Sequence, residues 1–286
     1  AELAALKSLD HRGWRSRIID ITYPLSGGIH GLTEAMDRIC AEAREAVRLG
    51  FSLLILSDRN LGPDRIPISS LLAAGSVHHH LLLHTERTRI GIILETGEAR
   101  EVHHHCLLTG YGADAINPYL TFEALWHLRR QGLTSNGLDD EQIVENYRKA
   151  IAKGMRKVMG KMGISTLQSY KGAQIFEAVG LNREVVDRAF TGTASRIQGV
   201  GFSVLAEEAW RRHQLGYPAR SAENLEILPN PGDFQWRAKG EKHAWDPESI
   251  YYLQLASRTN DRAAYDEFAR LINEDSARRA SIRGLL

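Results

Sequence analysis

Cysteine is scarce in this sequence, in which Cys40 and Cys106 are the two cysteines among 286 residues. A disulfide framework needs several paired cysteines, so the sequence predicts reduced thiols and a cytoplasmic location. An iron–sulfur cluster held by this chain would need three or four cysteines, which excludes that kind of site. Both cysteines lie within apolar, helix-like patterns, and this position argues against either of them acting as a nucleophile.

An excess of one charge and long apolar runs are also missing. The formal charge is +1, from 36 Lys and Arg against 35 Asp and Glu. Because the two signs are interspersed, we predict neither nucleic acid nor an anionic membrane as a partner. No apolar run approaches the ~20 residues of a membrane-spanning helix. The length predicts one large domain, or one domain with an appendage.

Short apolar runs alternate with helical patterns from about residue 16 to residue 217. The run Phe51–Ser57 is apolar enough for a strand buried on both faces, which is typical of a parallel sheet. Strand and helix alternating through short connectors predict right-handed parallel βα units. We count five or six units, fewer than the eight of a closed barrel, and predict an α/β fold with an incomplete or degenerate (β/α) barrel. An open doubly wound sheet fits the same pattern. The expected strands are 16–23, 51–57, 89–95, 113–117 and 164–167. The expected helices are 31–50, 69–84, 99–109, 122–131, 141–162, 172–179, 184–189 and 203–213.

The character of the sequence changes after Tyr217-Pro218. Turn residues dominate 228–232, and helices are expected over 247–258 and 262–273. We therefore predict a βα domain over residues 1–217 and a helical or irregular extension over 218–286. The extension carries more large aromatic residues than a free linker would, so we expect it to pack against a partner surface, or to pair two copies as a homodimer. These aromatic residues are Trp236, Trp245, Tyr251, Tyr252, Tyr265 and Phe268.

Polar residues stand at the expected carboxyl ends of the strands, which is where βα folds carry their chemistry. They form either a vestigial site that now serves as polar structure or part of a functional surface, and the sequence leaves both open. The candidates are Ser57, Asp58, Arg59, Glu95, Asn117 and Thr166.

Histidine clusters suggest a metal site, but helical spacing argues against one. Consecutive helical residues point about 100° apart, so a run of three histidines cannot converge on one ion. His80 and His84 share a face, yet a zinc peptidase would need a glutamate where Leu81 stands. We expect hydrogen-bonding roles for most of these histidines. They are His78, His79, His80, His84, His103, His104 and His105.

Glycines that could cradle a phosphate occur at Thr191-Gly-Thr193 and Gly199-Val-Gly201. Neither stretch shows the strand-to-helix glycine pair of a phosphate loop, and an isolated GxG is a weak signal.

Several long stretches of the sequence are distinctive, and the densest is Lys157–Leu181. The others are Ile55–Arg59, Pro67–His80, Glu95–His104, Gly110–Tyr119, Thr191–Arg196 and Arg283–Leu286. In chain order they resemble the central domain of glutamate synthase large subunits, and the likeness covers essentially the whole chain. It departs locally at Leu82–Glu86.

The resemblance implies a part of a multi-domain enzyme that makes two glutamates from glutamine, 2-oxoglutarate and reductant. A glutaminase domain of that enzyme uses an N-terminal cysteine, whereas residue 1 here is Ala1. A flavin barrel of the same polypeptide carries FMN and an iron–sulfur cluster, which the resemblance places beyond Leu286. The closing residues lack a helix cap, and we expect a cut rather than a natural terminus there.

The resemblance therefore implies a chain without catalytic, cofactor-binding or metal residues of its own. As the central domain, it would position the glutaminase and FMN-binding domains and help enclose the ammonia passage between them. Two alternatives remain, a self-sufficient FMN-binding (β/α)-barrel oxidoreductase and a separate regulatory or interaction protein.

Overall fold

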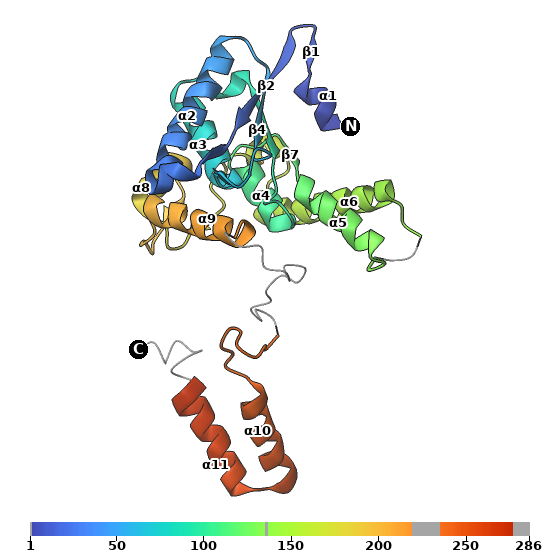
Figure 1. Ribbon diagram of the computed structural model, residues 1–286, viewed down its shortest axis with the longest axis vertical. Helices are drawn as coiled ribbons and strands as arrows, with labels where there is room; N and C mark the ends of the chain where they lie inside the picture. Colours follow the sequence, from blue (N-terminus) through green and yellow to red (C-terminus); the bar gives the residue numbers. More distant parts are fainter. Residues whose placement is uncertain (1, 135–136, 219–234, 277–286) are drawn as a thin grey trace. The chain divides into compact units, whose positions relative to one another are not determined.

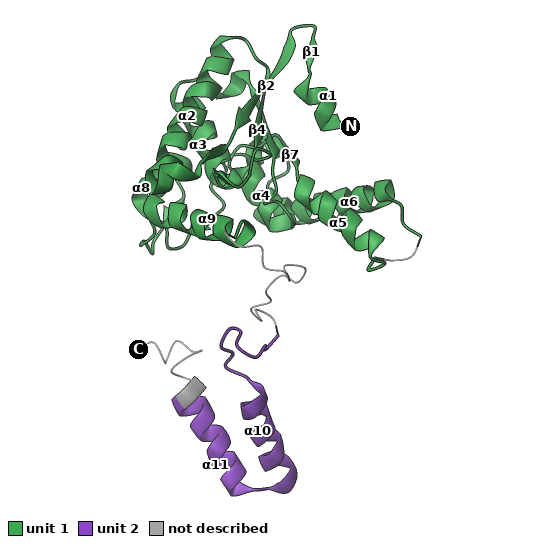
Figure 2. Ribbon diagram, in the orientation of Figure 1, with its two compact units in different colours: residues 1–219 green, residues 220–286 purple. Residues whose placement is uncertain are grey.

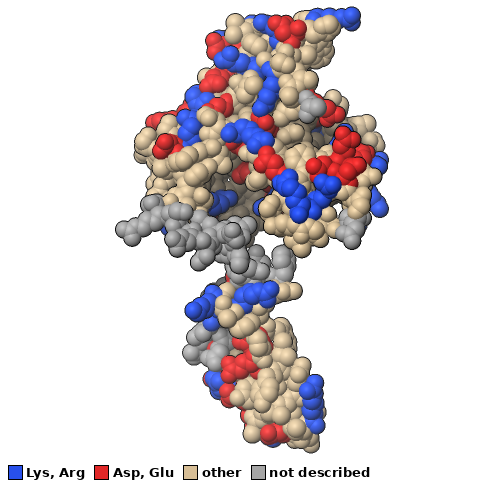
Figure 3. Space-filling view, turned by 45° about the vertical axis from the view of Figure 1, so that its right-hand side comes forward, with Lys and Arg blue, Asp and Glu red and all other residues tan. Residues whose placement is uncertain are grey.

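The computed structural model describes residues 2–134, 137–218 and 235–276. The chain divides into two compact units, Ala1–Ala219 and Arg220–Leu286 (Figure 2). Basic and acidic side chains lie interspersed on the face shown in Figure 3. Among the described residues, no helix is both long enough and apolar enough to cross a membrane.

The first unit is built on a five-stranded sheet with the strand order β1-β2-β4-β6-β7. Strands β2, β4, β6 and β7 are parallel, and β1 pairs antiparallel with β2 at the edge. Each parallel strand lies beside the one before it in this sheet, so the winding proceeds in one direction. The strands are β1 (Asp10–His11), β2 (Trp14–Asp20), β4 (Leu53–Ser57), β6 (Gly91–Glu95) and β7 (Ala115–Asn117).

The two faces of this sheet have different environments, because successive residues of a strand point to opposite sides. Ile19, Leu56 and Leu94 lie in register and join the main hydrophobic core. Figure 1 shows α2 (Gly28–Arg48) and α3 (Ser70–Leu83) on this side and α1 (Glu2–Lys7) on the other.

Helix α2 shows how the sequence determines these positions. Its apolar residues recur at helical spacing, and they are the residues that it buries, among them Met36, Ile39 and Ala43. The helix ends beside Gly50, whose φ of 75° is the left-handed conformation that glycine adopts most easily.

The remaining elements of this unit are short strands and peripheral helices. Helix α6 begins with a capping box, in which Asp139 and Gln142 exchange side-chain and backbone hydrogen bonds, and it ends at Gly163 in the left-handed region. The helices are α4 (Val102–Gly110), α5 (Tyr119–Arg130), α6 (Asp140–Met162), α7 (Leu167–Tyr170), α8 (Arg183–Ala189) and α9 (Phe202–Gly216), with 3₁₀ turns at Leu25–Gly27 and Arg87–Arg89. The short strands are β3 (Thr22–Pro24), β5 (Arg65–Pro67), β8 (Glu177–Ala178) and β9 (Ala194–Ser195).

Two sequence predictions are wrong in this unit. Residues 164–167 form no strand, because Thr166 is the N-cap of α7 and its hydroxyl accepts a hydrogen bond from the Ser169 amide. Residues 172–179 form no helix, because Gly172 and Gln174 have φ values of 70° and 55°, which a right-handed helix cannot contain. The main sheet therefore has four parallel strands, one fewer than expected. The α/β class with parallel strands is confirmed.

The second unit contains a helical hairpin of α10 (Pro247–Thr259) and α11 (Arg262–Arg270), followed by a π-helical turn, Leu271–Ser276. Asp246 caps α10, whose first residue is proline, and Asn260 ends it in the left-handed region. Trp245 and Phe268 stack with ring centroids 6.1 Å apart. Trp245, Tyr251 and Tyr265 are nevertheless 56%, 58% and 49% exposed, so this hairpin does not bury its aromatic residues within itself.

Candidate functional site

Polar side chains line up at the carboxyl ends of the parallel strands. Ladder pairing places Asp20, Ser57, Glu95 and Asn117 in one row across β2, β4, β6 and β7. The structure thus brings together most of the predicted residues, with Asp58 and Arg59 directly after β4. Thr166 is the exception, because it follows α6 rather than a strand of this sheet.

Glu95 is the centre of this row and is only 3% exposed. Its carboxylate accepts a hydrogen bond from the Ser57 hydroxyl at 2.5 Å and from Lys7 Nζ at 2.8 Å. The Arg59 Nε lies 3.7 Å from the same carboxylate. A buried carboxylate loses its hydration and is stable only when donors or cations replace it, and here Ser57, Lys7 and Arg59 do so. The arrangement fixes α1 to the sheet.

Arg59 and Asp58 extend the network toward α5. The Arg59 guanidinium lies 3.7 Å from the centre of the Tyr119 ring and donates to Glu123 at 2.9 Å. Asp58 accepts a hydrogen bond from the Gly97 amide at 2.8 Å. Burial, with the Glu95 charge adding to it, raises the pKa of Asp58, and burial also raises the pKa of Tyr119.

Sequence reasoning missed Asp20 and Lys7. The Asp20 carboxylate accepts from Thr22, from Asn60 at 2.8 Å and from Arg65 at 2.9 Å. Burial raises the pKa of Asp20, but the hydrogen bonds from Thr22 and Asn60 and the Arg65 charge outweigh it and lower the pKa overall. The signal that could have revealed Asp20 is its position as the single carboxylate inside the apolar run Ile18–Ile21. Nothing in the sequence signals Lys7.

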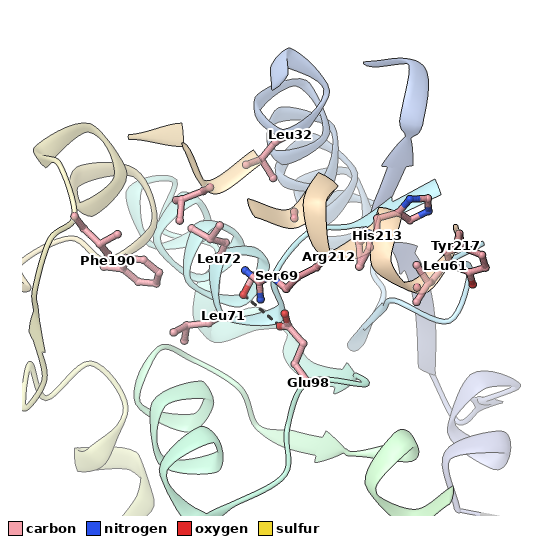
Figure 4. A pocket seen from close by; sticks show the side chains of 15 residues that line it. Leu32, Leu61, Ser69, Leu71, Leu72, Glu98, Phe190, Arg212, His213 and Tyr217 are labelled. Carbon is pink, nitrogen blue, oxygen red and sulfur yellow. Dashed lines mark hydrogen bonds between the residues drawn. The ribbon is translucent and has the colours of Figure 1, made fainter. Parts of the chain in front are cut away.

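A cavity of about 420 Å³ lies beside these strand ends, lined by α3, α9 and the loops after β4 and β6 (Figure 4). Most of its lining is apolar. The Glu98 carboxylate at its edge accepts from the Ser70 amide at 2.6 Å and the Ser69 hydroxyl at 3.2 Å. The Nε2 of His213 donates a hydrogen bond to the Gly62 carbonyl at 2.8 Å, which fixes this imidazole at the cavity wall.

The N-termini of α3 and α9 do not fit a flavin phosphate. Glu98 occupies the first amide of α3, and Glu184 accepts from the Phe202 amide at the start of α9 at 3.3 Å. The Glu184 carboxylate thus occupies the place beside the glycine stretch 199–201 where a phosphate would bind. Because the carboxylate and a phosphate are both negative, they would repel each other there.

Several of these histidines serve as hydrogen-bonding partners within the fold. His80 and His84 share a face of α3 with their ring centroids 4.5 Å apart, as their spacing predicts. His84 Nδ1 bonds the His80 carbonyl, and His104 Nδ1 accepts from the Arg100 amide at the start of α4. Within the described ranges, no three His, Cys, Asp or Glu side chains group as a metal site would require.

Both cysteines are buried free thiols on α2 and α4. Burial raises the pKa of Cys40 to about 11, with opposing smaller effects of Arg188 and Asp37. Burial also raises the pKa of Cys106. A protonated, buried thiol is a poor nucleophile.

Comparison with known proteins identifies the family. The family model described as glutamate synthase central domain matches residues 1–182. The chain belongs to this family. It is 48% identical over its whole length to "Glutamate synthase [NADH]" of Schizosaccharomyces pombe and 44% identical over 95% of its length to "Glutamate synthase [NADPH] large chain" of Bacillus subtilis. It is 38% identical over 88% of its length to "Ferredoxin-dependent glutamate synthase 1, chloroplastic/mitochondrial" of Arabidopsis thaliana.

The chain spans 14%, 17% and 16% of the lengths of those three glutamate synthases, respectively. A solved mutant flavocytochrome b2 with pyruvate bound aligns with 54% of the chain, over 38% of its own length, at 12% identity and a TM-score of 0.35.

Proposed function

We propose that the chain is a non-catalytic scaffold within a glutamate synthase, which converts glutamine, 2-oxoglutarate and reductant into two glutamates. It would position the glutaminase and FMN-binding domains of the same polypeptide and help enclose the ammonia passage. The observation that supports this role is the strand-end row, where Glu95 is compensated by Ser57, Lys7 and Arg59. A reactive centre would need groups that remain available to a substrate.

The fold supports the same proposal. Four parallel strands wound in one direction match the first part of a (β/α) barrel, in which neighbouring strands follow the chain order. We therefore propose an incomplete barrel as the central domain, residues 1–217, and a connecting extension toward the flavin domain, residues 218–286. FMN and the iron–sulfur cluster would belong to the parent enzyme outside this chain, and a cytoplasmic location remains our prediction.

An activity assay tests the proposal directly. Given glutamine, 2-oxoglutarate and an electron donor, the purified chain should form no glutamate and release no ammonia. Turnover above a heat-inactivated control that disappears in Glu95→Gln would contradict the scaffold role. A yellow preparation that releases stoichiometric FMN on denaturation would instead support the flavoenzyme alternative.

A second test addresses positioning. In a full-length polypeptide with all three domains, Lys7→Met removes the ion pair with Glu95. This variant should still release ammonia from glutamine, while its formation of glutamate from glutamine falls. If both activities fall together with the amount of folded enzyme, the effect is on stability and the positioning role loses its support.

A further inference from the structure

From Asn146 onward, α6 belongs to a stretch of sequence that carries positive but no negative side chains. No Asp or Glu occurs between Glu145 and Glu177. The stretch contributes +7 to a formal charge of +1, so the residues outside it have six more negative than positive charges. Its Lys and Arg residues are Arg148, Lys149, Lys153, Arg156, Lys157, Lys161 and Lys171.

Most of these cations lie along one side of α6. Helical side chains four residues apart lie one above another, and four lysines of α6 follow each other at this spacing, over about 18 Å of the helix. The helix lies beside α5 at the periphery of the first unit (Figure 1). We call this side the basic face. Its residues, all of them exposed, are Lys149, Lys153, Arg156, Lys157 and Lys161.

The surrounding structure leaves most of the basic face unpaired. Lys149 lies 3.5 Å from Glu145, which is the last carboxylate of α6. The other four cations make no hydrogen bond or ion pair with any residue that the structure describes. Four exposed charges therefore stand close together without counter-ions in the described part of the chain.

Helix stability does not explain this arrangement. Like charges one turn apart repel each other and weaken a helix. The helix dipole favours cations only near the last turn, which accounts for Lys161 alone. Exposed cations of other helices in this unit are instead paired one turn away, as Arg38 is with Glu42 on α2 and Arg211 is with Glu207 on α9.

The remainder of α6 argues against a membrane or a nucleic acid as the partner. The apolar side of the helix contacts the unit itself, since a Cβ at Gly154 would touch Val102 and the Tyr147 ring lies 5.7 Å from that of Phe122. Residues 148–162 contain no aromatic side chain on which a base could stack. A nucleic acid would also extend beyond the basic face, over the rest of a chain whose net charge there is negative.

We propose that the basic face of α6 docks against an acidic surface on another domain of the glutamate synthase polypeptide. Such a surface would supply the counter-ions that the described residues do not. The chain spans only 14% and 17% of two relatives, so most of those polypeptides lies outside the matching region. A domain tethered to the chain also meets this face at a high effective concentration. The inference rests on the proposed function and adds the place and the chemistry by which a neighbouring domain is positioned.

Carbodiimide cross-linking of a full-length polypeptide with all three domains tests this contact. The reagent joins a lysine amine to a carboxylate only where the two groups touch. Peptide mass spectrometry should find Lys153 linked to an Asp or Glu that lies outside residues 1–286. Raising the salt from about 0.1 M to about 1 M should reduce these links, because the Debye length falls from about 10 Å to about 3 Å.

The double variant Arg156→Glu, Lys157→Glu reverses the charge of the face and leaves Lys153 to report the contact. Links from Lys153 should fall at least about tenfold, because like charges then meet across the contact. Lys239→Glu, Lys242→Glu is the matched control, with the same charge change at two exposed lysines of the second unit. It should leave the links unchanged. Urea unfolding of the isolated chain should show that the Arg156→Glu, Lys157→Glu variant is at least as stable as the parent, because it removes repulsion within α6.

The proposal is wrong if Lys153 forms no link outside residues 1–286, if its links join two copies of the chain, or if the control variant loses them equally. It is also wrong if the isolated chain binds single-stranded DNA and the charge-reversed variant does not, since the face would then serve a nucleic acid. Glutamate formation by the isolated chain would instead contradict the scaffold role, so the two proposals fail by different measurements.

Discussion

Lys7 is the residue through which α1 is bound to the strand-end row. It contacts Glu95, whose side chain is only 4% exposed, while Lys7 itself is 32% exposed. The ammonium therefore keeps part of its hydration, whereas the carboxylate depends on its partners within the fold.

Replacing Lys7 by methionine should destabilise the first unit by about 1–3 kcal/mol, because Glu95 would stay buried with fewer donors. Urea unfolding measures this difference. Lys149→Met is the control, since Lys149 pairs with Glu145 on the exposed surface of α6 and its loss should cost less than about 0.5 kcal/mol. Equal effects of the two substitutions would show that the Glu95 network contributes no more than a surface pair.

His78 should make the free energy of unfolding depend on pH. The pKa of folded His78 is about 4, below the usual histidine value of 6.5, because the imidazole is buried and faces Arg87, His79 and Lys171, with Asp114 opposing them. Between pH 4 and pH 6.5 the unfolded chain therefore binds more protons than the folded chain. The contribution of neutral His78 to the free energy of unfolding is complete above pH 6.5 and is lost as the pH falls toward 4.

His78→Asn should reduce that pH dependence while keeping an acceptor for the Arg87 Nε, which donates to His78 Nδ1 at 3.0 Å. The measurement is urea unfolding at intervals from pH 7 to pH 4. His30→Asn, at an exposed position of α2, serves as the control. If the free energy of unfolding of the His78→Asn variant depends on pH as strongly as that of the wild type, His78 is not the cause of the dependence.

At the scale of elements, α3 and α8 approach each other closely at Gly75. A Cβ at this position would collide with the Ala189 carbonyl oxygen, which is backbone and cannot move alone. Gly75 is therefore required for the packing of these two helices, although it lies in the interior of α3.

Gly75→Ala should cost about 1–3 kcal/mol by forcing α8 away from α3. Gly160→Ala on α6 is the matched control, because a Cβ there meets no atom within 4 Å. In an exposed helix, that change should stabilise by about 0.5–1 kcal/mol. Thermal unfolding of both variants measures whether the Tm falls for Gly75→Ala and rises for Gly160→Ala. If both substitutions raise the Tm, α3 and α8 can move apart without a cost in stability.

The sequence was sufficient for elements with a strong pattern. Continuous apolar runs predicted β4 and β6, and helical periodicity predicted α2. It was insufficient where a short segment fitted two structures, as at Thr166, whose β-branched surroundings suggest a strand while its hydroxyl caps a helix. The strand-end row was predictable because parallel strands end together. Lys7 was not, because its contact with Glu95 spans 88 residues.

At the scale of the whole molecule, the first unit contains a hydrophobic core of its own. Every member of its main buried cluster lies at or before Ala206. A chain shortened to residues 1–218 should therefore unfold cooperatively with an unchanged Tm. A fall of more than roughly 4 °C, which corresponds to about 1 kcal/mol in a domain of this size, would contradict an independent first unit.

The α10–α11 hairpin lacks a comparable core, and its need for a partner surface remains a prediction. Hydrogen exchange of its amides, measured with the mass of the full chain in solution, provides the test. Protection in a dimer would support pairing of two copies. Exchange as fast as in an unfolded peptide, in a stable monomer, would show that the exposed Trp245, Tyr251 and Tyr265 find no surface.

The one-directional strand order also has a consequence for synthesis of the chain. Each of β4, β6 and β7 pairs with a strand that has already been made, so no parallel strand of this sheet must wait for a later neighbour. Loop closure then spans one βα unit at a time, which keeps the contacts of the growing sheet local in sequence. A nascent chain can thus extend its sheet strand by strand as it leaves the ribosome, with each new parallel strand pairing along the edge that the previous strand left free.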